Sequence, residues 1–585
     1  MTAASSTPHR VVVIGHGMVG HRFVAELARG AEQSARSGRP IDVEVSVLGA
    51  EPYEPYNRLM LSEVLAGRAD LGGLTLPAAP AGMRVFAGRP AVELNRESRV
   101  VVDDLGSEHP YDTVVLATGA APRVPRLAGL PADSDPDDLP PGVRALRTVD
   151  DCRELLALAS GRGREGGAPR VVVLGGGLLG LEAARALVGR GARVAVVHSG
   201  AHVLDRQLDA DAGSVLLRSL RDLGVHVVRS ARAAGLRRDD DGRLVGLDLA
   251  DGRHLRCDAV LLTAGVAPRV RLAVDAGLPC ERGVLVGDDL RSFADPAVAA
   301  IGDCAQTPAG CPGLLAPGWD QAAALAARLV GDLAGGSAEA ASVAASVAEE
   351  EPAAPEEVVR LKAADLDVVT FGRLPRAADP AVAGECVDDL AGWDATDSEC
   401  RCASEPAGPR VLALVDGQGR RSLRIAVHRG RLVGGELVGA GSLGADLVVA
   451  YERDLPLPLD PANLLVNGSA SLPTAASPAN IPGSATICRC NGVSKSAIVD
   501  AFQAGERTMP QLSATTRAAT GCGSCKDACT GILEWLEKSD PQQRDEAGGG
   551  TGGAGGADGS ESTTSTRSGA GTGSALLTQE RSTDS

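Results

Sequence analysis

The sequence predicts an α/β protein with parallel sheets over residues 8–335. Short apolar runs bounded by glycine alternate with helix-like stretches through this region: RVVVIG, DVEVSVLG, DTVVLATG, RVVVLGGG, RVAVVHS and DAVLLTAG. Continuous Val, Ile and Leu runs are typical of strands buried on both faces, which occur in parallel sheets with helices on either side. Two of the runs lead into glycine-rich turns of one pattern, which indicates two nucleotide-binding folds.

The two turns are RVVVIGHGMVGHRF and RVVVLGGGLLGLEAARAL, both of the form G-x-G-x-x-G between a strand and a helix. The first glycine makes the tight turn, the second lets the backbone approach a pyrophosphate, and the third lets helix pack on strand. A single match is weak evidence, because a glycine-rich turn need not bind anything. Two matches favour two bound dinucleotides, or one kind bound twice. The glycines are Gly15, Gly17, Gly20, Gly175, Gly177 and Gly180.

The bulk composition narrows the class of protein. A chain of 585 residues is too long for one hydrophobic core, so three or four domains are expected. A formal charge of −17 argues against nucleic acid or an anionic membrane as the main partner. No apolar run is long enough for a transmembrane helix, and the N-terminus lacks a signal peptide, so a cytoplasmic protein is expected. Thirteen cysteines do not suggest a secreted disulfide framework.

Three further motifs follow strand-like runs: YDTVVLATGAAPRVP, CDAVLLTAGVAPRV and VAAIGDCAQ. Their order around the second glycine turn resembles the two-dinucleotide flavoprotein reductases, in which an NAD(P) domain is inserted into an FAD domain. The resemblance implies that Asp303 hydrogen-bonds the flavin ribityl chain and that Trp319, in APGWDQA, lies beside the isoalloxazine ring. The other implied contacts are Ala117, Thr118, Gly119 and Gly302 for FAD, and Gly265 for NAD(P).

The second strand of each nucleotide fold is expected to end at the residue that reads the adenosine ribose. In the first fold, VSVLGAEPYEPYNRLMLS makes Glu51 the expected partner of the FAD ribose. In the second, VAVVHSGAHV puts His198 where NAD would call for an acidic residue. A neutral histidine accepts a ribose hydrogen bond and a charged one pairs with a 2′-phosphate, so NADH and NADPH both stay open, with NADH favoured. NAD(P)H is expected to dock along Gly175–Glu182.

Other stretches narrow the resemblance to the flavoprotein half of the assimilatory NAD(P)H-dependent nitrite reductase large subunit and the electron-transfer subunit of assimilatory nitrate reductase. They include EPYNRLMLSEVLAG, VVHSGAHVLDRQLD and RLVGGELVGAGSLGADLVVAYERDLPLP, and the similarity covers about residues 8–465. It implies that Arg58, in YNRLMLS, lies near the flavin. Disulfide reductases of this architecture carry a Cys-x4-Cys pair after the first ribose strand, whereas EPYEPYNRLMLSEVLAG contains no cysteine. An internal redox disulfide is therefore not expected there.

Two cysteine pairs lie further along the chain, in TICRCNGVSKSAI and TGCGSCKDAC. Zinc, two disulfides or an iron–sulfur cluster would each use four thiols. Cys-x-Cys is tight for zinc, and a reducing cytosol disfavours disulfides. The spacing resembles the bacterioferritin-associated ferredoxin-like (BFD-like) [2Fe–2S] domain, which implies a cluster, with Cys529 surplus and structural. The implied cluster ligands are Cys488, Cys490, Cys522 and Cys525.

The predicted architecture is a flavoprotein followed by a small α+β interface domain and a small helical domain, here called the cysteine domain. The predicted segments are FAD domain 8–145 and 256–335, NAD(P) domain 146–255, linker 336–357, interface domain 358–467 with a surface excursion at 376–409, linker 468–484, cysteine domain 485–540 and disordered tail 541–585.

The sequence therefore predicts an NAD(P)H-oxidising electron-transfer flavoprotein, with electrons passing through FAD and the [2Fe–2S] cluster to a separate redox subunit. Because no sirohaem domain follows the cysteine domain, assimilatory nitrate reductase is the expected acceptor. The alternatives are the flavoprotein part of a split assimilatory nitrite reductase, a ferredoxin-reductase-like component serving an oxygenase, and a redox sensor.

Overall fold

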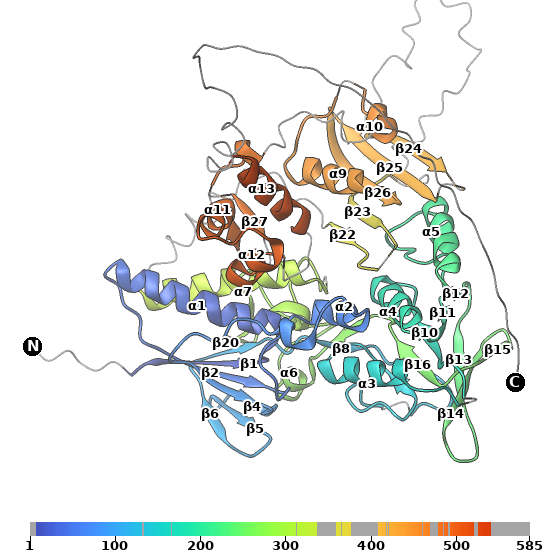
Figure 1. The fold of residues 1–585 in the computed structure, drawn as a ribbon. Coiled ribbons are helices and arrows are strands. Elements are labelled where there is room, and N and C mark those ends of the chain that lie inside the picture. The colour runs from blue at the N-terminus through green and yellow to red at the C-terminus, as the bar shows by residue number, and fades with distance from the viewer. Residues whose placement is uncertain are drawn as a thin grey trace, which may run out of the picture. The chain divides into compact units, whose positions relative to one another are not determined.

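The computed structural model describes most of residues 7–539, and Figure 1 shows their fold. The predicted linker at 336–357, nearly all of the excursion at 376–409 and the predicted tail at 541–585 lie outside the described residues. The described ranges are 7–335, 358–375, 408–467, 478–488 and 492–539, without 132–133, 165, 312, 364, 417, 419, 459, 484 and 520–524.

A six-stranded sheet carries the first glycine turn, in the order β19–β20–β7–β1–β2–β3. Its central strands run parallel, and the antiparallel β19 forms one edge. Val11, Val12 and Val13 in β1 are all buried, as the apolar run predicts for a strand covered on both faces. The strands are β1 (His9–Ile14), β2 (Val43–Gly49), β3 (Arg84–Ala87), β7 (Thr113–Leu116), β19 (Arg291–Ser292) and β20 (Asp295–Ala300).

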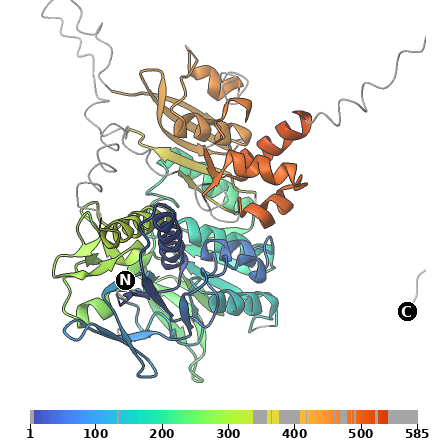
Figure 2. The same cartoon turned by 90° about the vertical axis from the view of Figure 1, so that its left-hand side faces the viewer.

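Two long helices, α1 (Met18–Arg36) and α7 (Leu315–Leu333), lie side by side on this sheet (Figure 2). They approach closely at Gly30, where an added Cβ would lie 2.8 Å from a methyl carbon of Val330. Smaller elements complete this part of the chain. They are β4 (Ala91–Asn95), β5 (Val100–Asp103) and β6 (Glu108–Pro110), α2 (Leu61–Leu65), α6 (Arg271–Asp275), β18 (Val284–Leu285), β21 (Ala305–Gln306), and the 3-10 helices η1 (Arg58–Met60), η2 (Leu71–Leu74) and η3 (Gly302–Cys304).

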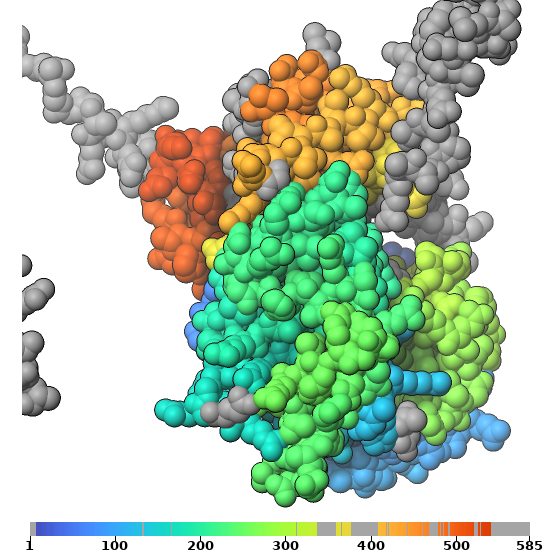
Figure 3. All heavy atoms as spheres, turned by 90° about the vertical axis from the view of Figure 1, so that its right-hand side faces the viewer, coloured from blue at the N-terminus to red at the C-terminus, as the bar shows by residue number. Residues whose placement is uncertain are grey.

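A second, five-stranded parallel sheet carries the second glycine turn, in the order β12–β11–β10–β16–β9. An antiparallel layer of β13, β14 and β15 accompanies it, and Figure 3 faces the teal-to-green part of the chain that contains both. The elements are β9 (Val143–Arg144), α3 (Val149–Ser160), β10 (Arg170–Leu174), α4 (Leu178–Gly189), β11 (Arg193–Val197), α5 (Ala210–Asp222), β12 (Val225–Val228), β13 (Ala233–Arg238), β14 (Leu244–Leu249), β15 (His254–Arg256) and β16 (Ala259–Leu262).

The strand pairing shows that the second sheet extends beyond both predicted boundaries of the inserted NAD(P) domain, 146–255. β9 and β16 pair with each other, and β16 pairs with β10, so the second sheet runs from Val143 to Leu262. The chain crosses between the two sheets at an antiparallel pair, β8 (Ala120–Pro122) and β17 (Val266–Pro268). The sequence-based boundary falls before the run DAVLLTAG, which supplies a central strand of the second sheet and not of the first.

The interface domain contains an antiparallel sheet in the order β22–β23–β26–β25–β24. Helix α9 packs on it over a core that includes Phe371, Leu423 and Leu437, each at most 2 % exposed. Asp-Gly and Arg-Gly turn signals predict such hairpins. The elements are β22 (Val359–Arg360), β23 (Val368–Gly372), β24 (Arg410–Asp416), β25 (Arg421–His428), β26 (Arg431–Val438), α9 (Ser442–Glu452) and α10 (Ala462–Asn467).

The cysteine domain is a short β-ribbon with three helices. The Ser494 hydroxyl accepts the Ala497 N–H and so caps the first helix, while Thr508 and Gln511 form a capping box on the second. Arg517 ends that helix in the left-handed conformation, with φ at 65°. The elements are η8 (Pro478–Asn480), β27 (Thr486–Cys488), β28 (Val493–Ser494), α11 (Lys495–Gln503), α12 (Met509–Thr516) and α13 (Lys526–Ser539).

A search of the described helices finds none that is long and apolar enough to cross a membrane.

The packing of α1 on α7 predicts changes of opposite sign in the free energy of unfolding for substitutions at two glycines. Gly30→Val should lower the free energy of unfolding by about 1–3 kcal/mol, because its side chain meets Val330. Gly331→Ala should raise it by about 0.5–1 kcal/mol, because that helical glycine has no atom within 4 Å of an added Cβ. Urea unfolding followed by circular dichroism compares the midpoints, and equal midpoints for both variants would contradict the close helix contact.

Candidate cofactor-binding site

The glycine turns have the same geometry in both sheets. Gly15 and Gly175 have φ of 113° and 122°, a backbone conformation that favours glycine. A Cβ on Gly15 would collide with the carbonyl of Ala117, and one on Gly175 would lie 2.5 Å from the carbonyl oxygen of Thr263. Each turn therefore packs directly on the end of the neighbouring strand, β7 or β16.

The third glycines, Gly20 and Gly180, lie against the carbonyls of Gly15 and Gly175, so neither has room for a side chain. Each helix thus starts close to its strand, as the G-x-G-x-x-G pattern predicts.

The middle glycines face free space. Gly17 and Gly177 cap α1 and α4, both in extended backbone conformations. No described atom lies within 4 Å of a Cβ on Gly177, and at Gly17 the nearest is Nη2 of Arg58 at 3.6 Å. The N–H groups at a helix N-terminus are unpaired and carry partial positive charge. Two open helix N-termini next to backbone without side chains fit the pyrophosphates of two dinucleotides.

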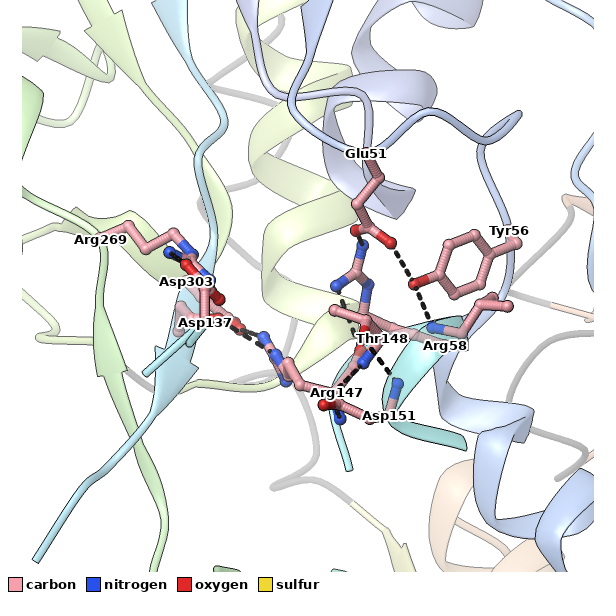
Figure 4. Close-up of polar contacts among 11 residues, drawn as sticks. Glu51, Tyr56, Arg58, Asp137, Arg147, Thr148, Asp151, Arg269 and Asp303 are labelled. Carbon is pink, nitrogen blue, oxygen red and sulfur yellow. Dashed lines mark hydrogen bonds and ion pairs between the residues drawn. The ribbon is translucent and has the colours of Figure 1, made fainter. Parts of the chain in front are cut away.

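Glu51 lies just beyond the end of β2, at the edge of this space. Its carboxylate accepts a hydrogen bond from the Tyr56 hydroxyl at 2.6 Å and pairs with Nη2 of Arg58 at 2.9 Å (Figure 4). The Tyr56 hydroxyl accepts the N–H of Val149, the first residue of α3, and burial raises the pKa of Tyr56. The structure thus brings Glu51 and Arg58 together, with Arg58 beside Gly17, and their contacts with FAD stay predictions.

Asp303 lies at the end of the first sheet, paired with Arg147 (Figure 4). Nη2 of Arg147 lies 2.8 Å from the Asp303 carboxylate, and its Nε donates to the Ala120 carbonyl at 3.1 Å. Burial lowers the pKa of the Arg147 guanidinium, while the Asp303 charge opposes that shift. The sequence reasoning missed Arg147.

The N-terminus of α3 holds Arg147 in place. Thr148 and Asp151 form a capping box, and Asp151 also accepts the backbone N–H of Arg147 at 2.7 Å. The Arg147 carbonyl accepts Nη1 of Arg58 at 3.4 Å. Asp303, Arg147, Arg58, Glu51 and Tyr56 therefore form one continuous set of polar contacts, here called the polar network, along the predicted FAD site. A capping-box signature in RTVDD was the available signal for Arg147.

The remaining predicted FAD contacts surround this network. Ala117 lies against Gly15 and Gly20. The Thr118 hydroxyl donates to the Arg269 carbonyl at 2.8 Å, and the Gly119 carbonyl accepts the Arg269 N–H at 2.9 Å. These two residues therefore connect the crossing strands that join the two sheets.

Three further predicted positions lie in η3, near the start of α7 and just before β17. The N–H of Gly302 donates to the Gln321 side chain of α7 at 2.7 Å. Gly318 packs close to Gly302, and Trp319 follows Gly318 in the second turn of α7. Gly265, predicted for NAD(P), has φ of 93° and accepts the N–H of Arg123.

Glu182 does not face the open space at Gly177. Its side chain is 6 % exposed and accepts the Ser62 hydroxyl at 2.6 Å and the backbone N–H of Lys362 at 3.0 Å. Burial raises the pKa of this carboxyl group. The structure therefore places Glu182 at a junction between α2, α4 and the start of the interface domain, one turn into the helix and away from its N-terminus.

His198 lies beside the second glycine turn, as predicted. Its Nδ1 accepts the backbone N–H of Gly176 at 3.2 Å, so the ring contacts the turn itself.

The predicted cluster ligands are described in part. Cys488 and Cys525 are buried, and the Cys525 thiol contacts both Cys488 and Cys529, which raises the pKa of Cys525. Cys490 and Cys522 lie outside the described residues. Among the residues that are described, no three His, Cys, Asp or Glu side chains form a metal-binding group, so the four-thiol set stays a prediction. The convergence of one cysteine from each pair fits a site shared by both pairs.

Arg517 connects the cysteine domain to the polar network. Its Nη2 donates to the Thr75 carbonyl at 2.6 Å. Thr75 in turn forms a β-bridge with Tyr56, whose hydroxyl holds Glu51. Arg517 lies five positions before Cys522. Its contact with Thr75 therefore links the stretch before that cysteine to the edge of the predicted FAD site.

Comparison with known proteins supplies two family matches. Residues 9–324 match the model for pyridine nucleotide-disulphide oxidoreductases, and residues 486–535 match the BFD-like [2Fe–2S] binding domain. The chain is 28 % identical to the nitrite reductase [NAD(P)H] of Bacillus subtilis (strain 168) over 91 % of this chain and 58 % of the relative. It is 27 % identical to the assimilatory nitrate reductase electron transfer subunit of the same organism, over 91 % and 60 %.

A relative from Klebsiella oxytoca, named nitrite reductase [NAD(P)H] large subunit, is 31 % identical over 90 % of this chain and 49 % of its own length. The chain thus spans about half to three-fifths of these curated relatives. Among solved structures, a covalent putidaredoxin reductase–putidaredoxin complex is similar with a TM-score of 0.58 and 20 % identity, over 80 % of this chain and 100 % of that one. This likeness confirms the flavoprotein reductase fold.

The open space at Gly177 generates a test of the second nucleotide site. Gly177→Ala should leave the fold intact, because the backbone has no positive φ and no atom of the described residues lies within 4 Å of the added Cβ. The added methyl group should displace the pyrophosphate and raise the KM for NAD(P)H about tenfold or more. Gly167→Ala, also in free space, is the matched control. Steady-state kinetics with ferricyanide as acceptor measures both, and an unchanged KM for Gly177→Ala would contradict the site.

Proposed function

The chain belongs to the pyridine nucleotide-disulphide oxidoreductase family, and from this premise we propose that it passes electrons from NAD(P)H to a separate assimilatory nitrate reductase subunit. The family implies FAD and NAD(P)H, and the BFD-like domain implies a [2Fe–2S] cluster. One observation carries the proposal: the similarity, over 91 % of this chain, to a relative named as the electron transfer subunit of assimilatory nitrate reductase.

The described residues fit these cofactors. When bound, FAD accepts a hydride from NAD(P)H and the [2Fe–2S] cluster carries single electrons onward. The N-termini of α1 and α4 offer backbone N–H groups to the two pyrophosphates, at Gly17 and Gly177. Arg58 lies beside Gly17, where its guanidinium adds positive charge to the first of these anion sites.

The polar network orients the residues that hold FAD. The Tyr56 hydroxyl, anchored on the N–H of Val149, keeps the Glu51 carboxylate at the end of β2 for the adenosine ribose. Arg147 fixes the Asp303 carboxylate, the proposed partner of the ribityl chain, at the other end of the site. Because the half-buried Arg147 pairs with Asp303, the ion pair holds the carboxylate in one orientation.

Despite the family's name, the stretch that follows the first ribose strand carries no cysteine pair. Residues 51–66 contain no cysteine. The nearby Cys152 is buried, with its thiol 3.6 Å from the Leu61 carbonyl, and burial raises its pKa to about 11. A thiol of that kind is a poor nucleophile at neutral pH. These observations support the cysteine domain as the outlet for electrons.

A second candidate is the flavoprotein part of an assimilatory nitrite reductase. Two relatives named as NAD(P)H nitrite reductases are 28 % and 31 % identical to the chain over about nine-tenths of its length. The two candidates differ in the nitrogen compound that the complete system reduces.

Gene disruption separates the candidates by the nitrogen source that supports growth. Loss of a nitrate reductase subunit should abolish growth on nitrate and leave growth on nitrite and ammonium unchanged. Loss of a nitrite reductase component should abolish growth on both nitrate and nitrite. Normal growth on nitrate would contradict both and favour service to another redox system, such as an oxygenase.

The Arg517 contact generates a prediction for the internal transfer step. We expect Arg517→Ala to slow reduction of the cluster about tenfold or more after mixing with NADH, because the contact with Thr75 positions the cysteine domain. Flavin reduction should be unchanged. Arg507→Ala is the control, since Arg507 stacks on Phe502 within the cysteine domain.

Stopped-flow absorbance follows flavin and cluster separately, with iron content measured to show that the cluster is retained. Equal cluster-reduction rates for Arg517→Ala and Arg507→Ala would contradict a positioning role for Arg517.

A further inference from the structure

The loop that follows β11 closes back on the second glycine turn. Nδ1 of His198 accepts the N–H of Gly176 at 3.2 Å, and the N–H of Leu204 donates to the Gly176 carbonyl at 2.9 Å. Both backbone polar groups of Gly176 are therefore held by residues of this loop. A Cβ on Gly176 would also lie 2.8 Å from a methyl carbon of Val203, so the loop and the turn are in close contact.

Leu204 holds this loop in a strained conformation. Its φ of 53° lies in the left-handed region, which a branched side chain rarely adopts, and its side chain is 2 % exposed. Backbone strain of this kind persists where the surrounding packing determines it, and such positions cluster at binding sites. The next residue, Asp205, lies beside His198.

Asp205 and His198 form a pair at the end of β11. The Asp205 carboxylate lies 3.4 Å from Nε2 of His198. Because a backbone N–H can only donate, Nδ1 must be the acceptor, and the proton of a neutral ring is on Nε2, toward the carboxylate. Gly200 leaves room for this arrangement, since a Cβ there would meet the Asp205 carboxylate and lie 2.7 Å from Nε2. The His198 side chain is 13 % exposed and that of Asp205 is 41 % exposed, so the carboxylate faces outward.

The end of this strand is where a dinucleotide's adenosine ribose is read in such a fold. We propose that Asp205, which lies beside His198, is the residue that makes the chain select NADH over NADPH. A carboxylate accepts hydrogen bonds from ribose hydroxyls and repels a 2′-phosphate. The inference rests on NAD(P)H oxidation by this chain and is independent of the final electron acceptor.

A positively charged side chain near the loop could instead favour NADPH. Arg229, just after β12, is exposed and its Nη1 donates to the Ala201 carbonyl at 3.5 Å. A 2′-phosphate bound by Arg229 would favour NADPH. The preference for NADH or NADPH therefore shows whether Asp205 or Arg229 dominates recognition of the ribose.

The test compares Asp205→Asn with Asp241→Asn, which removes an exposed carboxylate of the same domain that pairs with Arg243. The ratio of kcat/KM for NADH to that for NADPH is measured with ferricyanide as acceptor. The wild-type chain should prefer NADH, and Asp205→Asn should reduce the preference about five- to tenfold, mainly by improving NADPH. Asp241→Asn should keep the wild-type ratio, and Asp205→Glu, which retains the charge, should keep most of it.

A binding measurement without turnover accompanies the kinetics. ADP-ribose and 2′-phospho-ADP-ribose should compete with NADH for binding. Asp205→Asn should raise the affinity for 2′-phospho-ADP-ribose and leave the affinity for ADP-ribose unchanged. The gain should shrink at high salt, because salt screens the exposed charge. A wild-type preference for NADPH, or the same ratio for Asp205→Asn and Asp241→Asn, would overturn the assignment. FAD content measured for each variant shows that the proteins compared are folded.

Discussion

The close approach of a glycine turn to the carbonyl of a neighbouring strand determines where both predicted nucleotide sites lie. Gly15 packs on Ala117 and Gly175 packs on Thr263, and a positive φ at both turns favours glycine over other residues. Because the turn cannot widen, each helix begins at the end of a central strand with its free N–H groups facing open space. The same constraint, applied in two sheets, gives one chain two anion sites of the same design.

The rest of the FAD site depends on how α3 begins. Its capping box fixes Arg147, whose side chain pairs with Asp303 and whose carbonyl accepts Arg58. Its first N–H holds the Tyr56 hydroxyl, which holds Glu51. A helix that belongs to the inserted part of the chain therefore orients side chains of the first nucleotide fold. Hydrogen bonds thus couple the inserted part of the chain to the predicted FAD site.

The sequence was sufficient for the features that depend on local pattern. The glycine turns, the buried strands and the pairing of Glu51 with a nucleotide fold follow from residues close together in the chain. Arg147 was missed because its side chain reaches a residue 156 positions away, whereas the local capping-box signature indicates only the helix start beside it. Glu182 was predicted for NAD(P) from its place after the third glycine, but helix rotation turns it toward Ser62 and Lys362. The strained Leu204 that precedes Asp205 is likewise set by packing and not by composition.

The burial of Glu182 bears on how freely the parts of this chain can be separated. Its carboxylate is satisfied by a hydroxyl that precedes it by 120 residues and by an N–H that follows it by 180. A buried carboxylate without partners is costly, so truncating the chain at the first linker would remove a hydrogen bond from the nucleotide-binding helix. The flavoprotein part, cut at the predicted linker 336–357, is thus not a self-contained unit for gene fusion. A minimal reductase should retain residues 358–363, and natural recombination within this architecture should have kept them with the helix that they complete.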